Sequence, residues 1–353
     1  MKRWVCLLWP LLLACLLPLV ACRSETRTPL RVFIAGSLVV PFAELERAYE
    51  ALHPQVDVQV EAHGSIQVIR HVTEIQDLID VVVPADYALI PLLMYDNLLP
   101  DSDQPYANWY IRFASNHVVL AYTNESLAAE EINAGNWYQV LARPEVRFGL
   151  SDPRLDAAGY RSLMIVQLAE SYYNDPTLFE RIFLGRFNEP IQVSKEDGRL
   201  LVQVPELLAT RPDSNIRLRG SSVALLGLLE SGDIDYAFEY ESVARQHGLA
   251  FVELPPEINL GDPTQAAHYA GITVRLDYQR FASVRPEFVG ERISYAVTIP
   301  ANAPQPELAQ DFVAFLLSPQ GAHIMETHDH PVFAQPEVDN CPALPAGLQE
   351  FCD

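Results

Sequence analysis

The sequence has few cysteines, few basic residues and no low-complexity tract. Its 353 residues include five cysteines, and 24 lysines and arginines stand against 46 aspartates and glutamates. A chain this acidic is a poor partner for nucleic acid, and it would have to hold any anionic ligand by local dipoles. Hydrophobic residues make up 49% of the chain and charged residues 20%, which indicates a folded protein. Its length suits two lobes, each with its own core.

Local signatures of common enzymes are also absent. The sequence contains no G-x-S-x-G, no H-E-x-x-H and no G-x-x-x-x-G-K-[ST]. Serine, histidine and aspartate are all present, so a secreted hydrolase with a spatial triad stays open as an alternative. We expect no enzymatic activity.

The first 21 residues predict a targeting segment. Lys2 and Arg3 precede an apolar run, 4–20, that contains two prolines and is short for a membrane-spanning helix. The run leads into Leu19-Val20-Ala21-Cys22, which resembles the lipobox of bacterial lipoproteins. That resemblance implies cleavage before Cys22 and a lipid on its sulfur, hence an extracytoplasmic protein tethered to a membrane. A plain signal peptide and an uncleaved anchor are the alternatives.

Cys341 and Cys352 are the cysteines that would remain after this processing. They lie in a proline-rich tail, where a disulfide between them would pin the C-terminus and contribute about 2 to 3 kcal/mol. Their surroundings in the sequence give no sign of an activated thiolate, so we do not expect either to be catalytic.

A buried strand, a turn of small residues and a helix recur four times along the chain. In the first copy, the strand 32–35 leads through Gly36-Ser37 into a helix with apolar residues at Phe42, Leu45 and Tyr49. The corresponding later turns are His63-Gly64-Ser65, 151–159 and Arg219-Gly220-Ser221-Ser222. The N–H groups that begin a helix lack partners within it and lie at its positive end, so each turn is a potential oxyanion site.

The alternation of strands and helices predicts a doubly wound α/β fold. Strands are expected at 56–61, 79–83, 114–123, 146–150, 216–218, 236–240 and 293–299, and helices at 66–75, 160–173, 223–231 and 307–326. Residues 188–213 are interrupted by prolines and give no clear prediction. The expected division is a linker at 22–30, a first lobe at 31–113, a second lobe at 114–290, a return to the first lobe at 291–335 and a tail at 336–353. The two crossings would form a hinge, with the ligand in the cleft.

Short phrases spread over the chain resemble one family. They are Ala35-Gly36-Ser37-Leu38, Ala85-Asp86-Tyr87, Asn108-Trp109-Tyr110, Ser151-Asp152-Pro153, Gly159-Tyr160-Arg161-Ser162, Leu229-Glu230-Ser231-Gly232, Ile234-Asp235-Tyr236, Leu254-Pro255 and Glu257-Ile258-Asn259-Leu260-Gly261. In this order they are similar to the extracytoplasmic binding proteins of molybdate and tungstate ABC transporters, in the tungstate-binding branch, over residues 31–327. The resemblance implies a two-lobed periplasmic-binding-protein type II fold, each lobe a doubly wound mixed sheet with flanking helices. It also implies a monomer without a cofactor, which delivers molybdate or tungstate to a permease and its ATPase.

The resemblance further implies which residues hold the oxyanion. Ser37 and Ser65 would donate from the first lobe, Ala158 would offer its N–H, Ser222 would lie at the start of the fourth helix, and Tyr240 would donate its phenol. Four of these residues lie on the four turns described above. Each also has a purely structural interpretation, as a helix N-cap, a small packing residue or a buried tyrosine.

Asp156 matches a position at which the tungstate branch places a carboxylate against the metal and so expands its coordination. A second carboxylate of that branch comes from the start of the fourth helix, where this chain has Ser222, so tetrahedral or five-coordinate binding is as expected as octahedral. A carboxylate beside an oxyanion is repulsive unless it bonds to the metal or is protonated. The equal alternative for Asp156 is the N-cap of the helix that contains Gly159.

Other residues suggest competing interpretations. Arg70, Arg161 and Arg219 would make the cleft more positive, but each is more simply explained by a surface ion pair with a carboxylate. The cluster His328-Asp329-His330, with His323 and Glu326 nearby, suggests a metal-cation site, although histidines at a helix end also complement its dipole. Binding of sulfate, phosphate or an organic anion by the same neutral donors is a further alternative.

Overall fold

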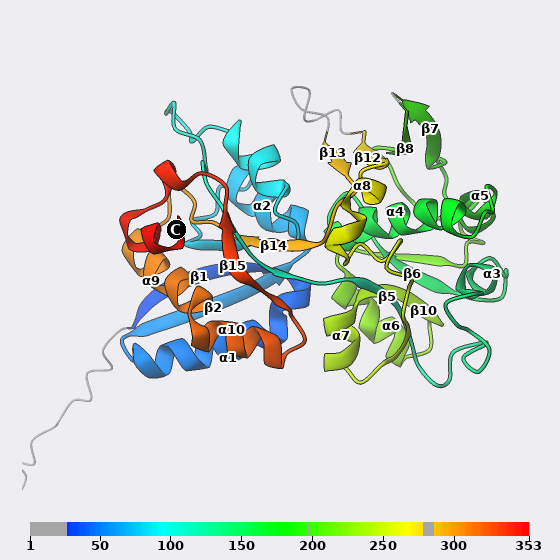
Figure 1. Cartoon of the computed structure of the whole chain (residues 1–353), viewed down its shortest axis with the longest axis horizontal. Helices are drawn as coiled ribbons and strands as arrows, with labels where there is room; N and C mark the ends of the chain where they lie inside the picture. Colours follow the sequence, from blue (N-terminus) through cyan, green and yellow to red (C-terminus); the bar gives the residue numbers. More distant parts are fainter. Residues whose placement is uncertain (1–26, 197, 278–285, 353) are drawn as a thin grey trace, which may run out of the picture.

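The computed structural model describes residues 27–196, 198–277 and 286–352, which Figure 1 draws as two groups of elements side by side. The predicted targeting segment and Cys22 lie outside the described residues. Within those ranges, none of the helices combines the length and the apolar character needed to cross a bilayer.

The first lobe is built on a parallel sheet. Its strands, in sheet order, are β2 (Val56–His63), β1 (Thr28–Ala35) and β3 (Val81–Val83). Helices α1 (Val39–Leu52) and α2 (Ser65–Thr73) follow β1 and β2. Because Ala35 lies opposite His63 in this register, the turns that follow the two strands lie at the same edge of the sheet. Phe42, Leu45 and Tyr49 are fully buried, which confirms the helical spacing.

The second lobe contains a mixed sheet with the predicted strand–turn–helix units. Its strands, in sheet order, are β11 (Ala250–Val252), β5 (Val118–Tyr122), β10 (Tyr236–Tyr240), β6 (Phe148–Ser151) and β9 (Ile216–Arg219). Strand β5 is antiparallel to both neighbours, whereas β10, β6 and β9 are parallel to one another. Helix α4 (Ala157–Tyr172) follows β6, and a 3-10 turn, η3 (Ser222–Leu225), leads from β9 into α6 (Leu226–Glu230).

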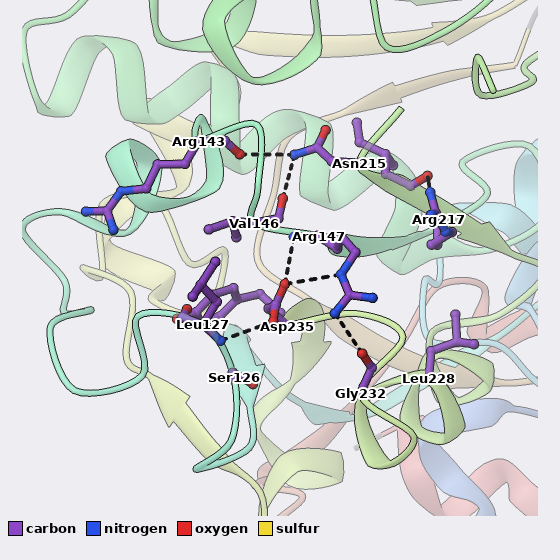
Figure 2. A network of polar contacts seen from close by, with 12 residues as sticks. Ser126, Leu127, Arg143, Val146, Arg147, Asn215, Arg217, Leu228, Gly232 and Asp235 are labelled. Atoms are coloured by element: carbon purple, nitrogen blue, oxygen red, sulfur yellow. Dashed lines mark hydrogen bonds and ion pairs between the residues drawn. The ribbon is translucent and has the colours of Figure 1, made fainter. Parts of the chain in front are cut away.

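A polar network fixes the amino ends of β6, β9 and β10 (Figure 2). The carboxylate of Asp235, directly before β10, accepts hydrogen bonds from the N–H groups of Leu127 at 3.1 Å and Arg147 at 2.8 Å. The side chain of Asn215, directly before β9, donates to the carbonyl of Val146 at 2.6 Å. These contacts leave the opposite edge, where the strands end, as the place for a ligand site.

Two further sheets complete the described chain. The second lobe adds β13 (Glu287–Val289), β12 (Ile272–Leu276), β8 (Arg199–Val204) and β7 (Gln192–Glu196), of which β7 and β8 come from the region without a clear prediction. Beside the first lobe lie β14 (Ser294–Val297), β4 (Ile111–Ser115) and β15 (Val332–Val338). The other described helices are η1 (Gly36–Leu38), the π-helix η2 (Pro91–Tyr95), α3 (Trp137–Leu141), α5 (Leu178–Phe183), α7 (Glu241–Gln246), η4 (Pro263–Gln265), α8 (Ala266–Tyr269), α9 (Pro306–Leu317), α10 (Pro319–Thr327), η5 (Cys341–Ala343) and η6 (Ala346–Cys352). The predicted α/β class, with mixed sheets and helices, is confirmed.

Two predicted elements are each divided in the structure. The expected strand 114–123 is interrupted at Asn116-His117, where the side-chain oxygen of Asn116 accepts the N–H of His117 at 2.9 Å. The expected helix 307–326 becomes α9 and α10, because Pro319 cannot donate to the preceding turn while Ser318 caps the new helix. Helix α9 packs on α1, as expected of a return to the first lobe, and Tyr49 donates to Asp311 across that contact at 2.7 Å. Near the C-terminus, Cys341 and Cys352 are joined by a disulfide.

Candidate functional site

The turns that end β1 and β2 meet the turns that end β6 and β9. At the start of α2, the N–H groups of Ile66 and Gln67 donate to the carbonyl of Leu155 in the second lobe at 3.1 and 3.2 Å. A Cβ atom placed on Gly64 would lie 2.5 Å from that carbonyl oxygen and 2.7 Å from the carbonyl oxygen of Gly220. The two backbones therefore approach one another as closely as glycine permits.

The carboxylate of Asp156 lies at the centre of this junction. Its Oδ1 accepts from the N–H of Ser65 at 3.2 Å, and its Oδ2 accepts from the N–H of Ser222 at 3.0 Å. Asp156 is the residue before α4, but its side chain makes no hydrogen bond to that helix, so it does not act as the local cap. Burial raises the pKa of Asp156, while the two N–H donors, the Ser151 hydroxyl and the charge of Arg161 act in the opposite direction.

Two hydroxyl groups at the junction accept a hydrogen bond and retain a hydrogen to donate. Ser65 Oγ accepts from the N–H of Ala85 at 3.0 Å, and Tyr240 Oη accepts from the guanidinium of Arg161 at 2.8 Å. A hydroxyl whose oxygen accepts still has its own O–H for another acceptor. Because burial raises the pKa of Tyr240 well above its ordinary value, the phenol keeps its proton at neutral pH.

Ser37 and Ala158 lie at helix starts on either side of the junction. Ser37 is buried, with its Oγ 2.8 Å from the Oη of Tyr295 on β14. The preceding Gly36 faces Val223 across the lobes, since a Cβ atom on this glycine would be 2.8 Å from a Val223 methyl group. Ala158 is the second residue of α4, in the turn whose N–H groups have no earlier partner within the helix.

Ser222 has a partner that the sequence reasoning missed. Its hydroxyl donates to Oε1 of Glu239 at 2.8 Å, and the N–H of Tyr240 donates to the same oxygen at 2.8 Å. Glu239 is fully buried in β10, and burial raises the pKa of its carboxyl to about 8. The sequence did contain a signal for Glu239. It is an acidic residue inside the otherwise apolar strand Tyr-Ala-Phe-Glu-Tyr, and glutamate is rarely buried without a partner.

Arg161 is buried between the lobes, which corrects its expected place on the surface. Its guanidinium donates to the carbonyl of Ala85 at 2.8 Å and lies 3.3 Å from the carboxylate of Asp86, both in the first lobe. The hydroxyl of Tyr160 donates to the same carboxylate. The expected pairing with a carboxylate is therefore present, but it joins two lobes and supports Tyr240.

The other two arginines make local contacts. Arg70 pairs with Glu74 one helical turn later at 2.9 Å, as expected of a surface pair. Arg219 is exposed and donates to the carbonyl of the preceding Leu218 at 2.9 Å. Neither contact brings its guanidinium to the carboxylate of Asp156.

The cation site suggested by the competing interpretation, after the last long helix, is not among the groups of described residues that could share an ion. His328 lies 2.6 Å from a carboxylate oxygen of Glu44, and His330 is buried against the Ser242 hydroxyl, where burial lowers the pKa of the imidazole to about 4. In the part of the chain that the structure describes, the group close enough to share a metal ion is instead His117, Glu241 and Glu253.

The fold and the site define a class of protein. Two α/β lobes that meet around main-chain and hydroxyl donors at the carboxyl ends of their strands are the architecture of a two-lobed ligand-binding protein. The chain belongs to the family of bacterial extracellular solute-binding proteins, whose model matches residues 30–328. An uncharacterized solute-binding protein of Methanococcus maripaludis is 40% identical over 313 residues, which cover 88% of this chain and 89% of that one.

Two solved structures share the fold. The periplasmic molybdate-binding protein of Azotobacter vinelandii superposes with a TM-score of 0.53 at 14% identity, over 85% of this chain and 98% of that one. The sulfate-binding protein SubI of Mycobacterium tuberculosis gives a TM-score of 0.55 at 13% identity, over 87% of this chain and 88% of that one. These similarities confirm the predicted type II fold of periplasmic binding proteins.

Membership in the family shows the general role of this protein and where it acts. Its members are substrate-binding transport proteins and not enzymes, so the hydrolase alternative is wrong. They act outside the cytoplasm and deliver their solute to the permease of an ABC transporter.

Proposed function

We propose that this protein binds molybdate or tungstate between its lobes and delivers the oxyanion to its permease. The observation that carries the proposal is the convergence of two N–H groups, from Ser65 in one lobe and Ser222 in the other, on the carboxylate of Asp156. A carboxylate is itself a small oxyanion, so main-chain donors that hold its two oxygens are placed for oxyanion oxygens. Donors without charge suit a fully ionised ligand.

The other donors complete a shell around the ligand. Ser37 and Ser65 offer hydroxyls from the first lobe, while Ala158 offers its N–H and Tyr240 its phenol from the second. Arg161 supports this shell by donating to Tyr240, which leaves the phenolic hydrogen for the ligand.

Asp156 favours molybdate and tungstate over sulfate and phosphate. A dianion beside this carboxylate is repelled unless the carboxylate bonds to the central atom or carries a proton. Molybdenum and tungsten accept more than four oxygen ligands, whereas the sulfur of sulfate and the phosphorus of phosphate stay four-coordinate in their stable anions. With Ser222 in place of a second carboxylate, we propose that on binding Asp156 exchanges its two N–H donors for the central atom, adding one oxygen to the four of the oxyanion, while the oxyanion oxygens take over those donors.

Calorimetric titration of residues 25–353 with molybdate, tungstate, sulfate and phosphate tests the proposal. We expect tight binding of the first two anions, and Asp156→Ala should weaken it about 100-fold or more, since a ligand to the metal is lost. Sulfate, which gains nothing from that carboxylate, should bind the variant no more weakly than it binds the native protein. Asp213→Ala, which removes an exposed ion pair with Arg211, is the control and should bind unchanged. If the native protein binds neither molybdate nor tungstate, the proposal is overturned.

We propose in addition that the mature protein is held at the membrane by a lipid on Cys22. The sequence Leu19-Val20-Ala21-Cys22 supports this anchor. Changing Cys22 to serine should move the protein from the membrane fraction to the soluble extracytoplasmic fraction, because serine offers no sulfur for the lipid. A native protein that is already soluble after fractionation would contradict the anchor.

A further inference from the structure

We propose that Glu239 is the proton acceptor of this site, so that in alkaline solution the binding of a dianionic oxyanion is accompanied by proton uptake at its carboxyl group. The inference rests on the proposed function and adds a residue and a linkage to it. Glu239 would not touch the oxyanion. It would act through Ser222 and Tyr240, the two proposed ligand residues that it contacts directly.

The two oxygens of the Glu239 carboxyl have different surroundings. Oε1 accepts the hydroxyl of Ser222 and the N–H of Tyr240, both at 2.8 Å. Oε2 is buried and has no hydrogen-bond partner among the residues that the structure describes. An ionised carboxylate with one oxygen buried and unpaired is costly, whereas a proton on that oxygen removes the charge and leaves both contacts of Oε1 in place.

The charges around the site already favour a neutral Glu239. Asp156 acts on this carboxyl from the turn before α4 and raises its pKa, whereas Arg161 of α4 is shared by Asp86 and Tyr240. From β14, Tyr295 is the titratable group that faces Glu239; its pKa is raised mainly by burial, with a smaller contribution from Glu239.

The remaining elements packed on this part of β10 bring little to balance the charge. Val119 of β5 lies opposite Glu239, and η3 contributes the hydroxyl of Ser222. In α7, Glu241 pairs with Arg245 at 2.5 Å and lies 3.4 Å from the imidazole of His117, the residue before β5. A bound dianion therefore adds negative charge to a buried site whose guanidinium is already engaged, and a proton is the available counter-charge.

The direction in which oxyanion affinity changes with pH follows from the direction of the pKa shifts of Glu239. Burial, with a further contribution from the charge of Asp156, raises the pKa of Glu239 to about 8 even though two hydrogen bonds act to lower it, and a nearby dianion raises the pKa further. Well below pH 8 the carboxyl is protonated with or without the ligand, so affinity there should not depend on its titration. Above pH 8 the free protein loses this proton and regains it on binding, so affinity should fall by about tenfold per pH unit until the pKa of the complex is reached.

Titration with molybdate from pH 6.5 to 9.5, in buffers of different ionisation enthalpy, measures both affinity and proton uptake. The native protein should show uptake that rises toward one proton above pH 8, together with the fall in affinity. Glu239→Gln keeps a carbonyl for Ser222 and Tyr240 and places an amide at the Oε2 position. It should bind molybdate without the fall in affinity above pH 8 and without the proton uptake. Glu241→Gln, an acidic neighbour in α7, is the matched control and should behave as native.

Infrared difference spectra keep the test decisive if the glutamine variant does not fold. At pH 9, molybdate should convert a carboxylate band of the native protein into a carboxylic acid band. In Glu239→Asp, which retains a carboxyl group at that position, this band should shift. Proton uptake that persists in Glu239→Gln, or that is absent from the native protein at saturating molybdate above pH 8, would overturn the inference while the proposed function stands. A native protein that binds neither molybdate nor tungstate at any pH would instead overturn the proposed function.

Discussion

At the scale of the residue, the site depends on hydroxyl groups whose direction is set by buried neighbours. Tyr240 accepts from Arg161 and Ser65 accepts from Ala85, so each O–H is left to donate outward. A hydroxyl in such a place is a donor of known direction, which is what an oxyanion requires.

Tyr240→Phe tests this arrangement with little change in volume. The variant removes the phenolic donor and the acceptor of Arg161, so molybdate affinity should fall about tenfold, the value of one hydrogen bond to a charged group. Tyr122→Phe, on the neighbouring strand β5, is the control and should bind as native. Titration calorimetry of the three proteins at pH 7 gives the comparison, and equal affinities would remove Tyr240 from the ligand shell.

At the scale of the element, the start of α2 carries the contact between the lobes. Gly64 has a backbone conformation, φ −62° and ψ 143°, that any residue adopts. Glycine is therefore required here because the carbonyl groups of Leu155 and Gly220 leave no room for a Cβ atom.

Gly64→Ala should leave each lobe folded and hold the two apart. We expect a loss of molybdate affinity of about tenfold or more, because the donors of Ser65 and Ser222 no longer reach one ligand. Thermal unfolding without ligand should change little. Gly227→Ala in α6, where a Cβ atom meets nothing within 4 Å, is the matched control. Native affinity in Gly64→Ala would contradict the close approach described above.

At the scale of the whole molecule, closure joins Asp86 of the first lobe to Tyr160 and Arg161 of the second. This contact is buried, with the Arg161 and Asp86 side chains 3% and 5% exposed. Removing one partner of a buried ion pair leaves the other charge uncompensated, at a typical cost of about 3 to 5 kcal/mol.

Asp86→Asn should therefore shift the lobes toward an open arrangement. In small-angle X-ray scattering, we expect a larger radius of gyration than that of the native protein at the same molybdate concentration, together with weaker binding. Asp339→Asn alters a similar contact with a tyrosine, Tyr95, on the exposed surface and serves as the control. A radius and an affinity equal to native would show that the pair does not hold the lobes together.

Local pattern was sufficient for much of the architecture. Apolar spacing identified α1 through Phe42, Leu45 and Tyr49, and the four small-residue turns were recognised because glycine and serine at a helix start have distinct backbone roles. The division at Ser318-Pro319 was also readable in principle, since proline removes a donor wherever it stands.

The partners of the site residues were beyond the reach of local pattern. Asp156 binds Ser65 and Ser222, which lie 91 and 66 positions away in the chain, and no spacing rule links such residues. Burial likewise turned Arg161 from an expected surface cation into the link between the lobes, and it gave Glu239 a perturbed pKa. Helix starts and periodicity depend on neighbours along the chain, whereas burial, pairing and pKa depend on what the fold brings alongside.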